Sequence, residues 1–181
     1  MSSENNEQLR PSPPSSFDFR LAVFDLDLTL FDGMKLFEDV HSILSRLKAD
    51  GVKLYIASFH LEAADCCKFL GIAHYFEDIL YGRNRTKAEM IQDILGRHSG
   101  MRGYNTVFFD DNFENILDVK IKTGIRTIHI DRFGLTWTDV PVKFSMCSAS
   151  ANIYNSFNDF QLEDRCEVNF RTNIKFDEFE Y

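Results

Sequence analysis

The sequence reads LAVFDLDLTLF over residues 21–31, and this short stretch carries most of the information on the fold. Its first four residues are apolar and β-prone, which predicts a buried strand in the middle of a parallel sheet. Two carboxylates, Asp25 and Asp27, then interrupt the apolar run. Because buried charges are costly without a partner, the pair predicts a compensating hard cation bound by oxygen, most simply Mg²⁺. A strand that ends in a polar turn with solvated aspartates is the alternative.

Composition and charge indicate which broad class of protein this chain belongs to. The chain has 181 residues, 44% hydrophobic and 27% charged, as in one ordinary globular domain. No apolar run approaches the roughly 20 residues of a membrane span, and the N-terminus lacks a secretory apolar segment. The cysteines have no zinc-site spacing, so we expect free thiols and a cytoplasmic protein with no membrane partner. The net charge of -8 disfavours nucleic acid as a partner, although a local basic groove is compatible with it.

Strand and helix patterns alternate along the chain with short connections. Strands are predicted at residues 21–24, 52–57, 79–81, 106–109 and 126–130, and helices at 36–47, 62–70, 87–97 and 114–122. This alternation predicts a doubly wound (Rossmann-like) α/β fold with a parallel sheet of about five strands. Right-handed crossovers would bring the carboxyl ends of the strands to one edge, so polar residues from three strand ends would meet there: Asp25, Asp27, Ser58, Asp110 and Asp111.

The two ends of the chain differ from this core. Residues 1–16 are rich in Ser, Pro, Asn and Glu, and predict a disordered arm. Residues 17–134 form the predicted core domain. Residues 135–181 lack a clear period but contain several phenylalanines, so we expect this extension to pack on the core or on a second subunit of a homodimer.

Four motifs resemble, in their order, those of the haloacid dehalogenase superfamily of aspartate-nucleophile phosphatases. They are Asp25-x-Asp27-x-Thr29, then Ser58 at a strand end, Lys87 at a helix start, and the Asp110-Asp111 pair after a strand. The segments VFDLDLTLF, Thr86-Lys87 and VFFDDNFENI are most similar to acid phosphatases of the magnesium-dependent phosphatase-1 type. The resemblance covers about residues 20–132.

The resemblance implies a role for each carboxylate. Asp25 would be the nucleophile that forms an aspartyl-phosphate, and Asp27 the general acid and then base. Asp25 and Asp111 would bind Mg²⁺ through their side chains and Asp27 through its backbone carbonyl. Asp110 would be a neighbouring metal ligand or would hold a metal-bound water.

The resemblance also implies a phosphate-binding set. The hydroxyls of Thr29 and Ser58 would donate hydrogen bonds to phosphate oxygens. Lys87 would both bind the substrate and act in catalysis, by placing a positive charge against the negative charge that develops.

The sequence departs from the family pattern in the regions that would recognise a substrate. The intervals before and after Ser58 each have room for one helix and no cap domain. Magnesium-dependent phosphatases carry a longer flap after the first motif. Here residues 31–34 are almost directly followed by the predicted helix, so the sequence predicts no such flap. Phe59 stands where that subfamily has an arginine.

An uncapped site is typical of enzymes with large substrates, so a phosphoprotein is expected, with a phosphorylated small molecule as the other possibility. The alternatives are a phosphatase of the RNA polymerase C-terminal-domain type, a polynucleotide-end phosphatase, a non-catalytic scaffold that binds phosphorylated partners, and a structural protein with a metal-stabilised acidic loop.

Overall fold

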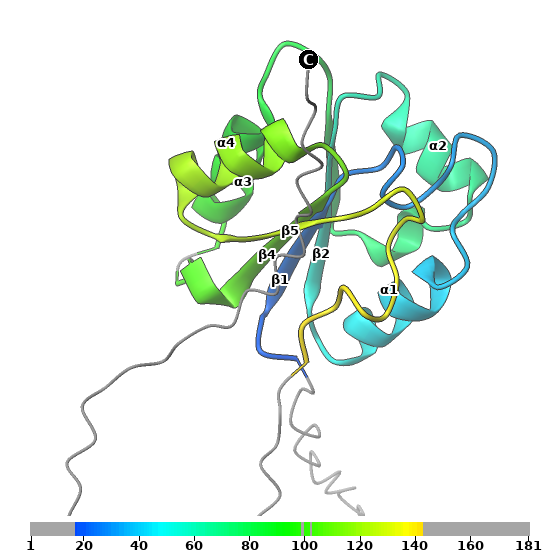
Figure 1. The fold of residues 1–181 in the computed structure, drawn as a ribbon, viewed down its shortest axis with the longest axis horizontal. Helices are drawn as coiled ribbons and strands as arrows, with labels where there is room; N and C mark the ends of the chain where they lie inside the picture. Colours follow the sequence, from blue (N-terminus) through cyan, green and yellow to red (C-terminus); the bar gives the residue numbers. More distant parts are fainter. Residues whose placement is uncertain (1–16, 99, 102, 143–181) are drawn as a thin grey trace, which may run out of the picture. The chain divides into compact units, whose positions relative to one another are not determined.

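A computed structural model describes residues 17–98, 100–101 and 103–142. Five parallel strands form one sheet in the order β3-β2-β1-β4-β5 (Figure 1). Their bounds are Leu21–Phe24 for β1, Lys53–Ser58 for β2, Asp78–Tyr81 for β3, Thr106–Asp110 for β4 and Arg126–His129 for β5. This sheet confirms the predicted fold class. The predicted arm, 1–16, and residues 143–181 of the predicted extension lie outside the described residues.

Helices cover both faces of the sheet (Figure 1). α1 (Val40–Ala49) and α2 (Ala63–Phe69) pack on one face, and α3 (Lys87–Gly96) and α4 (Phe113–Thr123) on the other. Two short 3₁₀ turns, Ala73–Tyr75 and Gly103–Asn105, complete the connections. Within the described residues, none of the helices has the length and apolar character needed to cross a lipid bilayer.

β1 is buried on both faces, which explains its continuous apolar sequence. Ala22 and Phe24 belong to the core beneath α1 and α2, whereas Leu21 and Val23 belong to the core beneath α3 and α4. The ring of Phe24 stacks on that of Phe109 in the neighbouring strand β4, with 4.9 Å between the ring centroids. The central position of β1 therefore holds the residue after it, Asp25, over the middle of the sheet.

Capping residues fix the starts of the two helices nearest the site. A capping box begins α3: the backbone N–H of Glu89 donates to the hydroxyl of Thr86, and the N–H of Thr86 donates to the Glu89 carboxylate. The side chain of Asn112 accepts from two N–H groups at the start of α4. The box makes Lys87 the first residue of α3.

The connection from β1 to α1 differs from the prediction. The Asp32 carboxylate accepts from the backbone N–H groups of Met34 and Lys35, both at 2.9 Å, and Phe31 pairs with Leu36 in an antiparallel bridge. Residues 31–36 therefore form a small hairpin, and α1 begins only at Val40. The prediction that a helix follows almost directly, with helical positions from residue 36, was wrong. It rested on the spacing of apolar residues, and the hairpin also directs apolar side chains toward the core.

The last described residues pack on the same core. Leu135 and Val140 are buried in the core beneath α1 and α2, and the backbone N–H of Leu135 donates to the carbonyl of Thr29 at 2.9 Å. Gly134 has φ +75°, and a Cβ at this position would lie 2.1 Å from the Phe37 ring. This segment therefore braces the loop that follows β1.

Candidate active site

The candidate site lies where the carboxyl ends of three strands meet the start of α3. Asp25 follows β1, Ser58 ends β2, Asp110 ends β4, and Lys87 opens α3. Ligands of open α/β sheets bind at this edge, because every strand-to-helix loop lies there. The structure thus places the main residues of all four predicted motifs in one region.

A buried lysine links these elements. The Lys87 side chain is 2% exposed, and its ammonium donates to the Asp25 carboxylate and to the backbone carbonyl of Ala57, the latter at 2.7 Å. It also lies 3.3 Å from an oxygen of Asp110. The ring of Phe59 covers it, with 4.9 Å between the ammonium and the ring centroid. Lys87 is therefore held in one position by contacts from β2, from β4 and from the residue that follows β1.

The environment of Asp25 changes its acidity. The pKa of its carboxyl is raised from 3.8 to about 7; burial is the main cause, the charge of Lys87 opposes it, and the charge of Asp110 adds to it. The side chain keeps a small exposed fraction. A carboxyl that is buried, perturbed and still reachable is typical of a functional group rather than of a surface residue.

Asp110 is oriented by donors that the sequence analysis did not identify. Asp110 is fully buried, and it accepts from the backbone N–H of Asn112 at 2.8 Å. The side-chain amide of Asn115 donates to both of its oxygens, at 3.1 and 3.2 Å. Asn115 lies in the first turn of α4, five residues beyond Asp110. The only sequence signal for its contact with Asp110 is its position in the segment DDNFEN.

Three carboxylates form a cluster that fits a divalent cation. One oxygen from each of Asp25, Asp110 and Asp111 lies within 4.8 Å of the others. Burial, and then the neighbouring Asp110 charge, also raises the pKa of Asp111. Hard cations such as Mg²⁺ take oxygen ligands of this kind, and a cation would relieve the repulsion among the three groups. The donor set therefore fits the predicted metal.

The loop after β1 has an unusual backbone. Among the described residues, Leu28 is the one non-glycine residue with a positive φ, at +59°. Its N–H donates to the carbonyl of Phe31, and that of Leu30 donates to Leu26. Such conformations are uncommon for apolar residues and are found at sites where a side chain must be aimed. Here the turn leaves Asp27 half-buried and Thr29 fully buried on either side of Leu28.

The two predicted phosphate-donor hydroxyls lie below the surface. Ser58 and Thr29 are both fully buried. The Ser58 oxygen accepts from the backbone N–H of His60 at 3.1 Å, and the Thr29 hydroxyl has no hydrogen-bond partner in the described part of the chain. Contact between these hydroxyls and a phosphate therefore requires a local opening of the loops above them.

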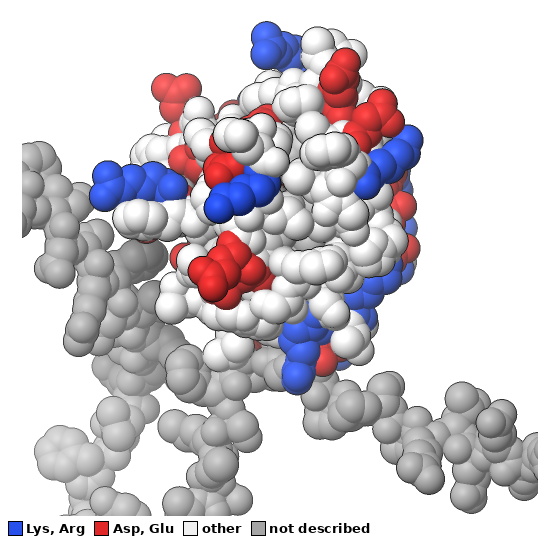
Figure 2. All heavy atoms as spheres, turned by 90° about the vertical axis from the view of Figure 1, so that its right-hand side faces the viewer, with Lys and Arg blue, Asp and Glu red and all other residues white. Residues whose placement is uncertain are grey.

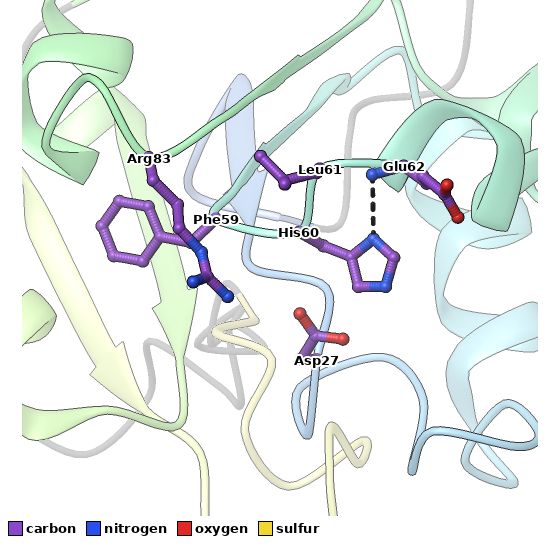
Figure 3. Close-up of a pocket in the computed structure, with 6 residues that line it drawn as sticks. All are labelled: Asp27, Phe59, His60, Leu61, Glu62 and Arg83. Atoms are coloured by element: carbon purple, nitrogen blue, oxygen red, sulfur yellow. Dashed lines mark hydrogen bonds between the residues drawn. The ribbon is translucent and has the colours of Figure 1, made fainter.

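A pocket of about 350 Å³ opens beside Asp27. Its walls come from the loop after β1, the loop after β2 and the loop after β3 (Figure 3). The lining residues are Asp27, Phe59, His60, Leu61, Glu62 and Arg83. Because Phe59 also covers Lys87, this pocket adjoins the buried cluster of charges.

Comparison with known proteins shows which solved structures have a similar fold. No protein-family model matches the sequence, and no curated protein matches it. The structure is similar to a haloacid dehalogenase-like hydrolase from Streptococcus pneumoniae, with a TM-score of 0.57 and 18% identity over 67% of this chain and 89% of that chain. It is also similar to the core domain of a protein from that organism, provisionally described as a phosphoglycolate phosphatase, with a TM-score of 0.51 and 20% identity over 72% and 92% of the two chains.

A third similar structure contains a metal. It is the N-terminal part of a Bacteroides fragilis protein with a phosphatase domain, in complex with Mg, with a TM-score of 0.51 and 17% identity over 65% of this chain and 37% of that chain. At such identities, the likeness establishes the fold alone. The chain has the α/β fold of haloacid dehalogenase-like proteins, and the closer resemblance to magnesium-dependent phosphatase-1 stays a prediction from the sequence.

Proposed function

We propose that this chain is a phosphatase that hydrolyses phosphomonoesters with Asp25 as its nucleophile. The observation that carries the proposal is the buried contact between Asp25 and Lys87, beside Asp110, at the carboxyl end of the sheet. The raised pKa of Asp25 and the adjoining pocket support a catalytic role over that of an ion pair that only stabilises the fold. Similar folds in proteins described as hydrolases and phosphatases support it further.

The residues suggest a reaction in two steps. First, an oxygen of Asp25 forms a bond to phosphorus while the bond from phosphorus to the alcohol oxygen breaks, and Asp27 gives that oxygen a proton. Second, the Asp27 carboxylate takes a proton from a water molecule whose oxygen attacks phosphorus, and the bond to Asp25 breaks to release phosphate. The Lys87 ammonium stabilises the negative charge that develops in both steps.

We propose Mg²⁺ as the cofactor. Asp25, Asp110 and Asp111 would hold it, together with the backbone carbonyl of Asp27 that the resemblance implies. The cation, when bound, offsets the charge repulsion between an anionic phosphate and a carboxylate nucleophile. Mn²⁺ accepts the same oxygen ligands, so both metals are expected to support turnover.

The site is proposed to be uncapped and to act on a phosphorylated protein or small molecule. The order of elements supports this, because the described residues place a single α-helix between β1 and β2, and one α-helix with a 3₁₀ turn between β2 and β3. On the face that Figure 2 shows, basic and acidic side chains are interspersed among uncharged ones. Among the described residues on that face no continuous basic surface is seen, which agrees with the net charge of -8 in disfavouring nucleic acid as the substrate.

Hydrolysis of para-nitrophenyl phosphate tests the proposal. Wild type is expected to turn it over only with Mg²⁺ or Mn²⁺, and Asp25→Asn is expected to be inactive with either metal. Asp118→Asn is the matched control, since Asp118 lies on α4 in an exposed ion pair with Lys122. Equal activity of wild type and Asp25→Asn would overturn the assignment of the nucleophile.

A further inference from the structure

We propose that Arg83 selects phosphomonoesters whose alcohol portion carries a carboxylate. This inference rests on the proposed phosphatase function and specifies the substrate of the same site. It concerns a residue outside the four motifs, in the loop after β3, and it begins from the different surroundings of two neighbouring arginines.

Arg83 and Arg85 differ in their partners. The Arg85 guanidinium donates to the Asp93 carboxylate at 2.6 Å and to the backbone carbonyl of Glu89 at 3.0 Å, so it is held on α3. Arg83 is exposed and lines the pocket, and no hydrogen bond or ion pair joins its guanidinium to any residue that the structure describes. Its five N–H donors are therefore free for a ligand, and guanidinium binds carboxylates with two parallel hydrogen bonds.

The direction of the side chain points to the alcohol portion of the substrate. Figure 3 shows the Arg83 guanidinium reaching past Phe59 toward the side of the pocket where Asp27 lies. Asp27 is the proposed proton donor to the leaving oxygen, so the alcohol must occupy the space beside it. The phosphate itself would lie at Asp25 and Lys87. A group that Arg83 contacts therefore belongs to the alcohol and not to the phosphate.

His60 adds a second donor to the same pocket. Its Nδ1 accepts from the backbone N–H of Glu62 at 3.1 Å, so in the neutral ring the proton is on Nε2. The Glu62 carboxylate is turned away from Asp27 and Arg83 (Figure 3). Donors from Arg83 and His60 thus line a pocket whose remaining walls include the apolar side chains of Phe59 and Leu61.

The pocket has room for a small alcohol portion. At about 350 Å³ it lies near the lower end of the range for small-molecule sites. Short carbon chains would contact Phe59 and Leu61, and a terminal carboxylate would meet Arg83. Small carboxylate-bearing esters are therefore favoured over neutral ones of equal length.

A matched pair of substrates tests this inference. We compare kcat/KM for 3-phosphoglycerate and glycerol 3-phosphate, which share a carbon chain and differ by a carboxylate. Wild type is expected to prefer the carboxylate ester by about two- to fivefold, in line with an exposed charge-assisted contact, and Arg83→Gln is expected to bring the ratio to about one. Arg85→Gln is the control and should keep the wild-type ratio.

The possible failures are distinguishable. Equal rates on both esters in wild type, or a ratio that Arg83→Gln leaves unchanged, would overturn the inference while the phosphatase function stands. Faster hydrolysis of a phosphoserine peptide with uncharged neighbours than of 3-phosphoglycerate would overturn it as well. Failure on these esters and also on para-nitrophenyl phosphate with metal present would overturn the proposed function itself.

Discussion

The ammonium nitrogen of Lys87 lies 3.3 Å from a carboxylate oxygen of Asp110. The first residue of α3 thereby contacts the last residue of β4, and the same ammonium contacts Asp25 and the carbonyl of Ala57. One buried cation thus ties the ends of three strands to one helix. Because two buried carboxylates depend on it, Lys87 is expected to contribute both to the stability of the fold and to the chemistry.

Replacing Lys87 by methionine is expected to destabilise the protein strongly. The change leaves Asp25 and Asp110 buried without their cation, and removing one member of such a cluster costs about 3–5 kcal/mol. Urea denaturation with a chelator present measures the loss. Lys68→Met, which breaks an exposed pair with Asp65, is the control and should cost less than about 1 kcal/mol.

A second variant separates charge from packing in this prediction. Asp25→Asn removes one of the two carboxylates left without a cation, so adding it to Lys87→Met should restore part of the lost stability. Equal stability losses for the single and the double variant would contradict the electrostatic explanation.

The stability of the metal-free protein is expected to depend on pH through Asp25. The pKa of Asp25 is raised from 3.8 to about 7 in the folded protein, so the folded state binds this proton more tightly than the unfolded state. The free energy of unfolding should therefore fall as pH rises from about 4 to about 7, relative to Asp25→Asn. Denaturant titrations of both proteins across this window measure the difference, and a difference that is constant or rises with pH would rule out the raised pKa.

The strands and the helix starts were predictable because their signals are local. Buried parallel strands have continuous apolar sequences, as in β1 and β4, and the carboxylates that end them stand out against that background. The capping box of Thr86 and Glu89 indicates a helix start at Lys87 through residue types and spacing alone, and α3 begins there. Together these signals predict the fold class and the edge of the sheet where the site residues gather.

The unpredicted features depend on contacts between distant residues. Leu36 has the spacing of a helical residue relative to Val40, but it pairs with Phe31, and apolar spacing does not distinguish these two arrangements. Phe59 was noted only as a departure from the family, whereas the structure places its ring over Lys87. The contact of Asn115 with Asp110 could not be predicted from the sequence either. An asparagine in the first turn of a helix is ordinarily a solvated or capping residue.

Asn115→Ala is expected to weaken metal binding. The Asn115 amide orients both oxygens of Asp110, and loss of such a supporting contact typically costs about 10- to 100-fold in metal affinity. The concentration of Mg²⁺ that raises the melting temperature should increase accordingly. Asn105→Ala changes the same residue type just before the opposite end of β4 and should leave the Mg²⁺ dependence unchanged. Identical titrations for wild type and Asn115→Ala would contradict the role.

Gly134→Ala tests the contact that braces the loop after β1. A Cβ at this position would lie 2.1 Å from the Phe37 ring at a φ of +75°, so overpacking and backbone strain add, and we expect a loss of about 2–4 kcal/mol. Gly33→Ala has a positive φ but open space around the added Cβ and should cost about 1 kcal/mol. Chemical denaturation measures the free energy of unfolding of both variants. Equal losses of stability would mean that the Phe37 ring can move aside without an energetic penalty.

Trapping of the phosphorylated enzyme tests the central claim most directly. A substrate with a radiolabelled phosphoryl group is mixed with the protein and Mg²⁺, the reaction is stopped with acid within one turnover, and the labelled peptide is identified. We predict that the label lies on the peptide that contains Asp25 and is absent from Asp25→Asn. Label on another residue, or turnover by Asp25→Asn at the wild-type rate, would contradict the assignment of Asp25 as the nucleophile.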